Sequence, residues 1–278
     1  MGQNWLRSYC LKFGPSGGKG IEISSLRISF DISKSETESA NTGTISIWNL
    51  NQEHQELAET KDCLVELFAG YENQPLPCIF KGYVTFGNTV DDGADRRTDL
   101  ECVDGRVETR DTFISKSYSG SVPCNNIIDD AASEMGLAVE YAEDVSFSNI
   151  PNGYSVVGQA TDALDKACAS SGLQWNIDNG ILKIKNKGGK MSSRCYVISP
   201  DTGLVGFPRK VILSGDYAND DTVYGYEIDY LLNGAIHVSD YLFLDSSKVK
   251  GYFMASEIHM SGDTHSGDWM CSATLISC

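Results

Sequence analysis

The sequence predicts a mainly β protein of the α+β class, in which two antiparallel β-barrel modules flank a small helix–strand module. Apolar and polar residues alternate with period two in the first and last parts of the chain, as in strands that bury one face. Helical spacing of apolar residues is confined to the middle, and clusters of Gly, Pro, Asn and Asp separate the strand-like runs. We therefore expect an N-terminal β-barrel at residues 1–118, an α/β insert at 119–190 and a C-terminal β-barrel module at 191–278.

The N-terminal module is predicted from its alternating runs. The run Trp5–Phe13 alternates with Arg7 as the exception, and the run Leu26–Ile32 alternates without a break. A short helix after Asn51 is expected to interrupt the strands. Further strands are expected at Thr44–Trp48, Cys63–Ala69, Ile79–Phe86 and Arg97–Val103. These elements predict an antiparallel barrel or sandwich with one helix in a connection.

The middle segment contains two stripes at helical spacing. The first stripe consists of Ile127, Ile128, Ala131, Ala132 and Met135, and the second of Ala160, Ala163, Leu164, Ala167 and Cys168. Ser121 or Asn125 is the candidate N-cap of the first helix. Gly136 and Gly172 are placed to end the two helices in a left-handed conformation.

Each helix is expected to run into a strand. These strands are Leu137–Tyr141 and Leu173–Ile177. The turn Asp178–Gly180 then predicts a hairpin with Ile181–Lys185, because Asn-Gly suits a tight two-residue β-turn. The middle segment is therefore interpreted as a small α/β module, and Lys187–Lys190 marks its end.

Alternation returns in the last module, which contains no convincing helical pattern. The expected strands include Cys195 with Val197, Val211–Leu213, Val223–Leu232, Tyr241–Leu244, Tyr252–His259 and the run Trp269–Leu275.

Composition narrows the function. The chain has 278 residues and a formal net charge of −16, which repels a polyphosphate chain, so tight nucleic-acid binding is not expected. Nine cysteines without a C-x-x-C pair favour reduced thiols over a zinc site or a disulfide framework. Cys63, Cys102 and Cys271 are expected to be buried, and Cys278 exposed. No signal peptide or membrane-spanning run is visible, so folding in a cytoplasm without a membrane anchor is expected.

The sequence contains few candidates for catalytic, phosphate-binding or metal-binding residues. Residues 14–20 have neither the spacing nor the following helix of a phosphate-binding loop. The segment His259–Asp268 holds two histidines and two aspartates, which suit zinc or manganese. Its spacing fits no metalloprotease pattern and its Gly, Ser and Asp content is typical of a turn, so we interpret it as a turn between strands. We expect no catalytic, cofactor-binding or metal-binding residue.

Five stretches of the chain resemble one protein family, and they occur in the order that the family shows. They are Leu26–Ser35 followed by Asn41–Leu50, Leu67–Tyr71 followed by Ile79–Gly82, Ser199–Pro208, Tyr230–Asn233, and His259 with Gly262-Asp263 and Gly267-Asp268-Trp269. In this respect the chain is similar to the baseplate hub or tail-hub proteins of tailed phages, related to the late-control D type. The motif residues that carry the likeness, and that we expect to have structural roles, are Asn49, Leu50, Gly70, Tyr71, Gly82, Gly203, Leu204, Gly206, Pro208, Leu232, Asn233, His259, Gly262, Asp263 and Trp269.

The resemblance implies a structural subunit of the phage virion, assembled in the host bacterial cytoplasm. It implies a homotrimer whose tail-tube-like barrels form a pseudo-sixfold ring between a hexameric tail tube and a threefold tail tip. The implied partners are the tail tube or a distal tail protein, tail-tip, spike or fibre proteins, and a tape-measure protein. DNA would pass through the ring without specific binding, and no cofactor is implied.

Two other classes of function compete with this one. A tail-associated cell-wall hydrolase would draw on the carboxylates and the histidine-rich turn, and zymography on peptidoglycan would reveal it. A carbohydrate-binding β module would account for the β content and for aromatic residues such as Trp175 and Trp269. It would not account for the helical insert or for the order of the motifs.

Overall fold

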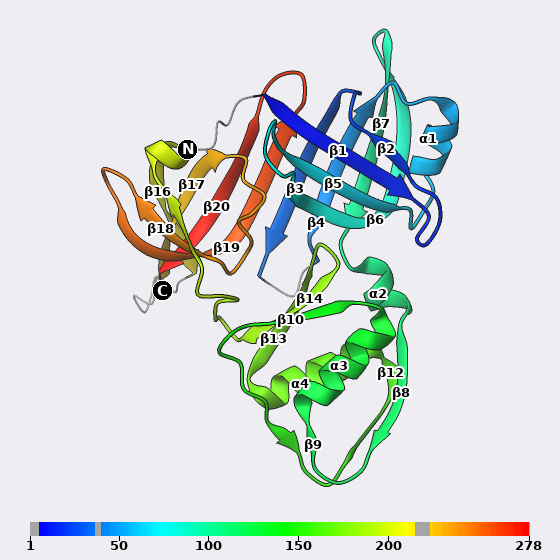
Figure 1. The fold of residues 1–278 in the computed structure, drawn as a ribbon, viewed down its shortest axis with the longest axis vertical. Helices are drawn as coiled ribbons and strands as arrows, with labels where there is room; N and C mark the ends of the chain where they lie inside the picture. The colour runs from blue at the N-terminus through cyan, green and yellow to red at the C-terminus, as the bar shows by residue number, and fades with distance from the viewer. Residues whose placement is uncertain (1–5, 37–39, 215–222, 278) are drawn as a thin grey trace.

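A computed structural model describes residues 6–36, 40–214 and 223–277, and shows a mainly β protein with few helices (Figure 1). The fold class predicted from the sequence is therefore confirmed. Trp5 and Cys278, to which the sequence assigned a strand position and an exposed thiol, lie outside the described residues.

The strands of the N-terminal part form one half of a large antiparallel sheet, here called the N-terminal β-unit. They are β1 (Arg7–Gly14), β2 (Ile21–Ile23), β3 (Ile28–Ser35), β4 (Thr42–Trp48), β5 (Leu64–Tyr71), β6 (Cys78–Asp92) and β7 (Asp95–Val103). The helix α1 (Gln52–Ala58) begins after Asn51, whose side chain accepts a hydrogen bond from His54 N, as the sequence predicts.

The strands after the insert form the C-terminal β-unit. They are β15 (Cys195–Ile198), β16 (Leu204–Ser214), β17 (Val223–Leu231), β18 (Tyr241–Asp245), β19 (Lys250–Asp263) and β20 (Trp269–Ser277). A single 3-10 turn, η1 (Pro200–Thr202), precedes β16.

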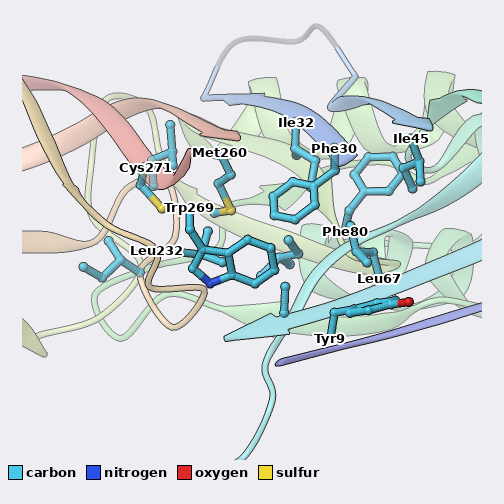
Figure 2. Close-up of a cluster of buried hydrophobic side chains, with 14 of the residues drawn as sticks. Tyr9, Phe30, Ile32, Ile45, Leu67, Phe80, Leu232, Met260, Trp269 and Cys271 are labelled. Carbon is cyan, nitrogen blue, oxygen red and sulfur yellow. The ribbon is translucent and has the colours of Figure 1, made fainter. Parts of the chain in front are cut away.

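The two β-units share one sheet and one core. Among the described residues the strand order is β16-β17-β20-β19-β3-β4-β7-β6-β5-β1-β2, with β18 and β15 branching from β19. The burial pattern of β3 alternates along its length, because successive side chains point to opposite faces of a strand. One cluster of buried residues extends from Tyr9 and Phe80 in the first unit to Trp269 and Cys271 in the second (Figure 2).

The middle of the chain forms the α/β insert, at the bottom of Figure 1. It contains α2 (Arg106–Asp111), β8 (Phe113–Tyr118), β9 (Val122–Pro123), α3 (Cys124–Met135), β10 (Ala138–Tyr141), β11 (Asn149–Ile150), β12 (Tyr154–Gln159), α4 (Ala160–Ser171), β13 (Leu173–Asp178) and β14 (Ile181–Asn186). Both predicted apolar stripes are buried in a second, separate core between α3, α4 and the strands.

Helix ends in the insert agree only partly with the sequence expectation. Gly136 and Gly172 end α3 and α4 in the left-handed conformation, as predicted. The prediction of Ser121 or Asn125 as N-cap of α3 is wrong: Pro123 occupies that position and makes no side-chain cap hydrogen bond. The first backbone N–H of α3, that of Cys124, is instead satisfied by the carbonyl of Ser148.

The turn between β13 and β14 attaches the insert to the large sheet. Asn179 and Gly180 both have positive φ, as a tight hairpin turn requires. Their backbone N–H groups donate to the Asp104 carboxylate at 2.6 and 3.2 Å, and Asp178 accepts a bond from Lys34 Nζ at 2.7 Å. The hairpin that the sequence predicts is therefore also the clamp between the insert and the β-units.

The boundary between the first module and the insert stays a proposal. Strand β8 pairs with β12, and Ile114 belongs to the core of the insert. These contacts favour a boundary some residues before position 118. Across the described residues, no helix has the length and apolar character needed to span a membrane.

Candidate functional site: the joint and the open edges of the sheet

The two β-units meet where β19 pairs with β3, and this region is here called the joint. Seven residue pairs join Glu257–Asp263 to Ser29–Ser35 in an antiparallel register without a bulge. Because backbone hydrogen bonds cross this boundary, the two units form one continuous sheet rather than two modules on a linker.

Trp269, the first residue of β20, fills this joint from the core side (Figure 2). Its ring contacts that of Phe30 edge to face, with centroids 5.3 Å apart and planes at 68°. Its indole Nε1 donates a hydrogen bond of 3.1 Å to the carbonyl of Gly70 at the end of β5. Trp269 therefore ties three strands from distant parts of the chain to one point.

Gly262 is the residue that permits this packing. A Cβ atom at position 262 would lie 2.4 Å from Cζ of Phe30 and 2.7 Å from Cε3 of Trp269. Only glycine leaves room for both rings at this place. Leu232 completes the joint, because its backbone N–H donates to the carbonyl of Trp269 at 3.1 Å.

The segment after Gly262 forms the turn between β19 and β20, as its composition predicts. Asp263 Oδ1 accepts hydrogen bonds from the backbone N–H groups of His265 and Ser266, at 2.8 and 3.3 Å. Its other oxygen forms an ion pair with Arg27 at 2.8 Å. Partial burial acts to raise the pKa of Asp263, but this ion pair and the backbone hydrogen bonds hold that pKa below its ordinary value. Within the described ranges, no group of three or more His, Cys, Asp or Glu side chains is placed to hold a metal ion.

The structure brings together seven of the motif residues and leaves the others apart. Around the joint lie Gly70, Tyr71, Leu232, Asn233, Gly262, Asp263 and Trp269. Tyr71 is buried there, which raises its pKa to about 12.

The remaining motif residues have local roles. Asn49 ends β4 with φ of 62° and exchanges hydrogen bonds with Arg96, and Leu50 is buried in the core beside it. A Cβ on Gly82 would meet the Phe80 ring at 2.8 Å. His259 pairs with Asp31 at 2.9 Å on the opposite face of the sheet from the core.

Gly203, Leu204, Gly206 and Pro208 belong to the entry of β16. Gly203 adopts φ of 113° after the 3-10 turn, and Gly206 adopts φ of 68° within an irregularity of the β16–β17 register between Val205 and Arg209. These residues shape the outermost strand of the sheet, at a distance from the joint along the strand order.

Two of the open sheet edges in the described structure are formed by β16 and by part of β6. Strand β16 pairs with β17 alone, and the part of β6 from Phe86 to Asp92 pairs with β7 alone. Both edges carry large exposed apolar side chains, with Phe86 57 % and Phe207 60 % exposed. Unpaired edges with apolar side chains are typical of surfaces that pair with another chain. Sequence reasoning missed these edges, since an alternating pattern does not say which strand is outermost.

Solved structures show which class of protein has this fold. The 43 kDa tail protein of prophage MuSo2 from Shewanella oneidensis is 12 % identical, with a TM-score of 0.66 over 97 % of this chain and 96 % of that one. The tail protein from Neisseria meningitidis MC58 is 10 % identical, with a TM-score of 0.63 over 97 % and 96 %. An E. coli type VI secretion component, the c3393 protein, is 9 % identical with a TM-score of 0.61 over 91 % and 73 %. The fold is thus that of tail proteins.

A family model identifies a narrower group of proteins than the fold does. The family model described as baseplate hub gp41 matches residues 15–247. This chain belongs to that family, and it is a baseplate hub protein of a phage tail, as the motifs of the sequence indicated. A comparison with curated protein sequences gave no match.

Proposed function

We propose that this chain forms a homotrimeric, pseudo-sixfold ring that joins a hexameric tail tube to a threefold tail tip and leaves a channel for DNA. Its role is structural and non-catalytic, and it assembles in the host cytoplasm before it becomes part of the virion. Its partners are the tube or a distal tail protein on one side, the spike or fibre proteins of the tip on the other, and the tape-measure protein.

The observation that carries this proposal is the single sheet shared by two β-units. A chain with two β-units side by side supplies two of six positions around a ring, so three copies present sixfold geometry to a tube and threefold geometry to a tip. The insert is attached to one end of this sheet and leaves the opposite end free for a second partner (Figure 1).

The ring would close through the open edges of β16 and β6. They lie at opposite ends of the eight-strand run from β16 to β6. An edge on one copy that pairs with a different edge on the next copy makes a heterologous contact, and such contacts close into a ring when the rotation fits. Burying Phe86 and Phe207 would then remove two large exposed apolar side chains from water.

Sedimentation velocity of edge variants tests the proposal. F86D and F207D place a charge in the contact and are expected to convert the trimer to monomer, because a buried unpaired carboxylate is costly. V157D is the matched control: Val157 is 85 % exposed on β12 of the insert, outside the large sheet, and this variant is expected to remain a trimer. Edge variants that keep the wild-type trimer would contradict ring closure through these strands.

A further inference from the structure

A cavity of about 680 Å³, partly open to solvent, lies where the insert meets both β-units. The turn of the β13–β14 hairpin forms one wall, and β10 with the segment 191–194 forms a second. The third wall is the segment 234–240 between β17 and β18, with Pro77 and Cys78 of the N-terminal β-unit beside it. A cavity of this size can hold a flexible organic group.

Asp240, at the end of the third wall, is a buried carboxylate without a counter-ion. It is 8 % exposed, and its Oδ2 accepts a hydrogen bond of 2.8 Å from the backbone N–H of His237. In the described part of the chain, neither of its oxygens forms an ion pair. Burial raises the pKa of Asp240, as expected for a carboxylate that its surroundings compensate only in part. A cation that entered the cavity would supply the missing partner.

The other buried charges of this cavity are already paired with one another. Asp178 accepts hydrogen bonds from Lys34 and Lys183 at 2.7 Å each, and its Oδ2 lies 2.8 Å from Nδ1 of His237. Both lysines are therefore held at Asp178, and neither makes a direct contact with the Asp240 carboxylate.

Exposed charges make the mouth of the cavity negative. Glu140 and Glu143 line it from the insert, and Arg194 lines it from the segment that follows the insert. Because Asp178 is balanced by its lysines, the charges that remain are three carboxylates, including that of Asp240, against one guanidinium. The excess of two negative charges attracts a cation from solution.

The remaining lining is apolar and suits a hydrocarbon stem better than a bare ion. Ile181, Met191 and Ala235 contribute to it, and the ring of Tyr196 is partly buried beside them. Over the described ranges, no three His, Cys, Asp or Glu side chains are grouped to hold a metal ion. Amphipathic cations such as the lysine and arginine side chains place an apolar stem along such walls and a charge at the end.

We propose that this cavity is a cation pocket, which binds an ammonium or guanidinium group on an apolar stem with Asp240 as its counter-ion. Glu140 and Glu143 attract the cation at the mouth. Two sources offer this chemistry, namely a lysine or arginine side chain of a partner protein and a free polyamine. The inference does not depend on the proposed ring, because one chain supplies every residue of the pocket.

Binding of small cations to the full chain tests the pocket by saturation-transfer NMR titration. The probes are N-acetyl-arginine amide, spermidine and N-acetyl-citrulline amide, which has nearly the shape of the arginine probe without its charge. The two cations are expected to bind, and the citrulline probe to bind at least about tenfold more weakly than the arginine probe, because it cannot form a charge-assisted pair. Equal binding of the arginine and citrulline probes, or no binding of either cation, would overturn the proposal.

Variants locate the binding within the molecule. D240N is expected to weaken cation binding at least about tenfold, since it removes the buried charge and keeps the shape of the side chain. D144N is the matched control, because Asp144 is exposed on the insert and does not line the cavity, and it should bind as wild type does. Melting curves establish that each variant is folded.

A second variant decides the matter if D240N does not fold. E140Q/E143Q changes only exposed side chains at the mouth, and it is expected to weaken binding at least about threefold at low salt and less at high salt. Wild-type affinity in every folded variant would overturn the cation pocket. Tighter binding of the arginine probe than of spermidine would assign it to a partner's side chain, and the reverse order would assign it to a free polyamine.

Discussion

At the scale of single residues, the joint depends on the absence of one side chain. Gly262 lies between the rings of Phe30 and Trp269 in an ordinary strand conformation, so its role is to leave space and not to adopt a special backbone angle. The sequence pattern marked Gly262 and Trp269 as motif residues. Their contact with Gly70 could not be predicted, because nothing local links β5 to β20.

Gly262→Ala is expected to lower the free energy of unfolding by about 1–3 kcal/mol, since the new methyl group must displace two packed aromatic rings. Gly251→Ala is the matched control: the nearest atom to its Cβ would lie 3.6 Å away, an ordinary contact, so its effect should be under about 1 kcal/mol. Urea denaturation of both variants measures the difference. Equal stabilities would show that the joint is not tightly packed.

At the scale of elements, the sequence predicted most strands and both long helices. A buried face requires apolar residues at regular spacing, with period two in strands and in a stripe along helices. It missed α2 and the strands β2, β8, β9, β11 and β12. Helix α2 has six residues and no side-chain cap, and β8 and β12 form an isolated pair whose exposed face mixes Ser with Phe113 and Val157. Short elements, and strands with apolar side chains on both faces, produce little periodic pattern in the sequence.

The β13–β14 hairpin holds the insert to the β-units through buried charges. Burial acts against ionisation of Asp178, but Lys34, His237 and Lys183 together hold its pKa well below the ordinary value. The stability that Asp178 contributes is therefore present above the unfolded pKa and is lost as the pH falls through the folded pKa. Within the clamp, the Asp178 carboxylate is thus paired with the ammonium groups of Lys34 and Lys183.

Asp104, beneath the same hairpin, has the opposite behaviour. Burial, with the nearby charge of Asp178, raises its pKa to about 6. The folded state therefore holds this proton when the unfolded chain has released it, so stability falls as the pH rises from about 4 to about 6, by up to about 3 kcal/mol.

Asp104→Asn removes this titration, and the decline of the unfolding free energy between pH 4 and 6 should become shallower than in wild type. Asp144→Asn, at an exposed site of the insert, should leave the decline unchanged. Denaturation at a series of pH values provides the comparison. A wild-type slope in Asp104→Asn would mean that Asp104 ionises normally in the folded protein.

At the scale of the whole molecule, the sequence predicted two β modules, and the structure shows that they share a sheet. The junction pairs residues 29–35 with residues 257–263, which lie near opposite ends of the chain. Alternation is the same on both sides of such a junction, so it cannot reveal which strands are neighbours. Periodicity does not identify the family either, whereas the order of the motifs along the chain does.

The proposed closed ring of three copies would account for both the continuous sheet and its open edges. The exposed cysteine in the described structure, Cys195, is not part of that explanation, so the assembly should not depend on disulfides. Association through β-strand edges and apolar contacts is insensitive to reductant.

The most direct test is the mass of the purified full chain in solution by light scattering, with and without reductant. The account predicts a trimer of about 91 kDa, three times the 30.3 kDa chain, in both conditions. A monomer at high concentration, or a trimer that reductant dissolves, would contradict the ring.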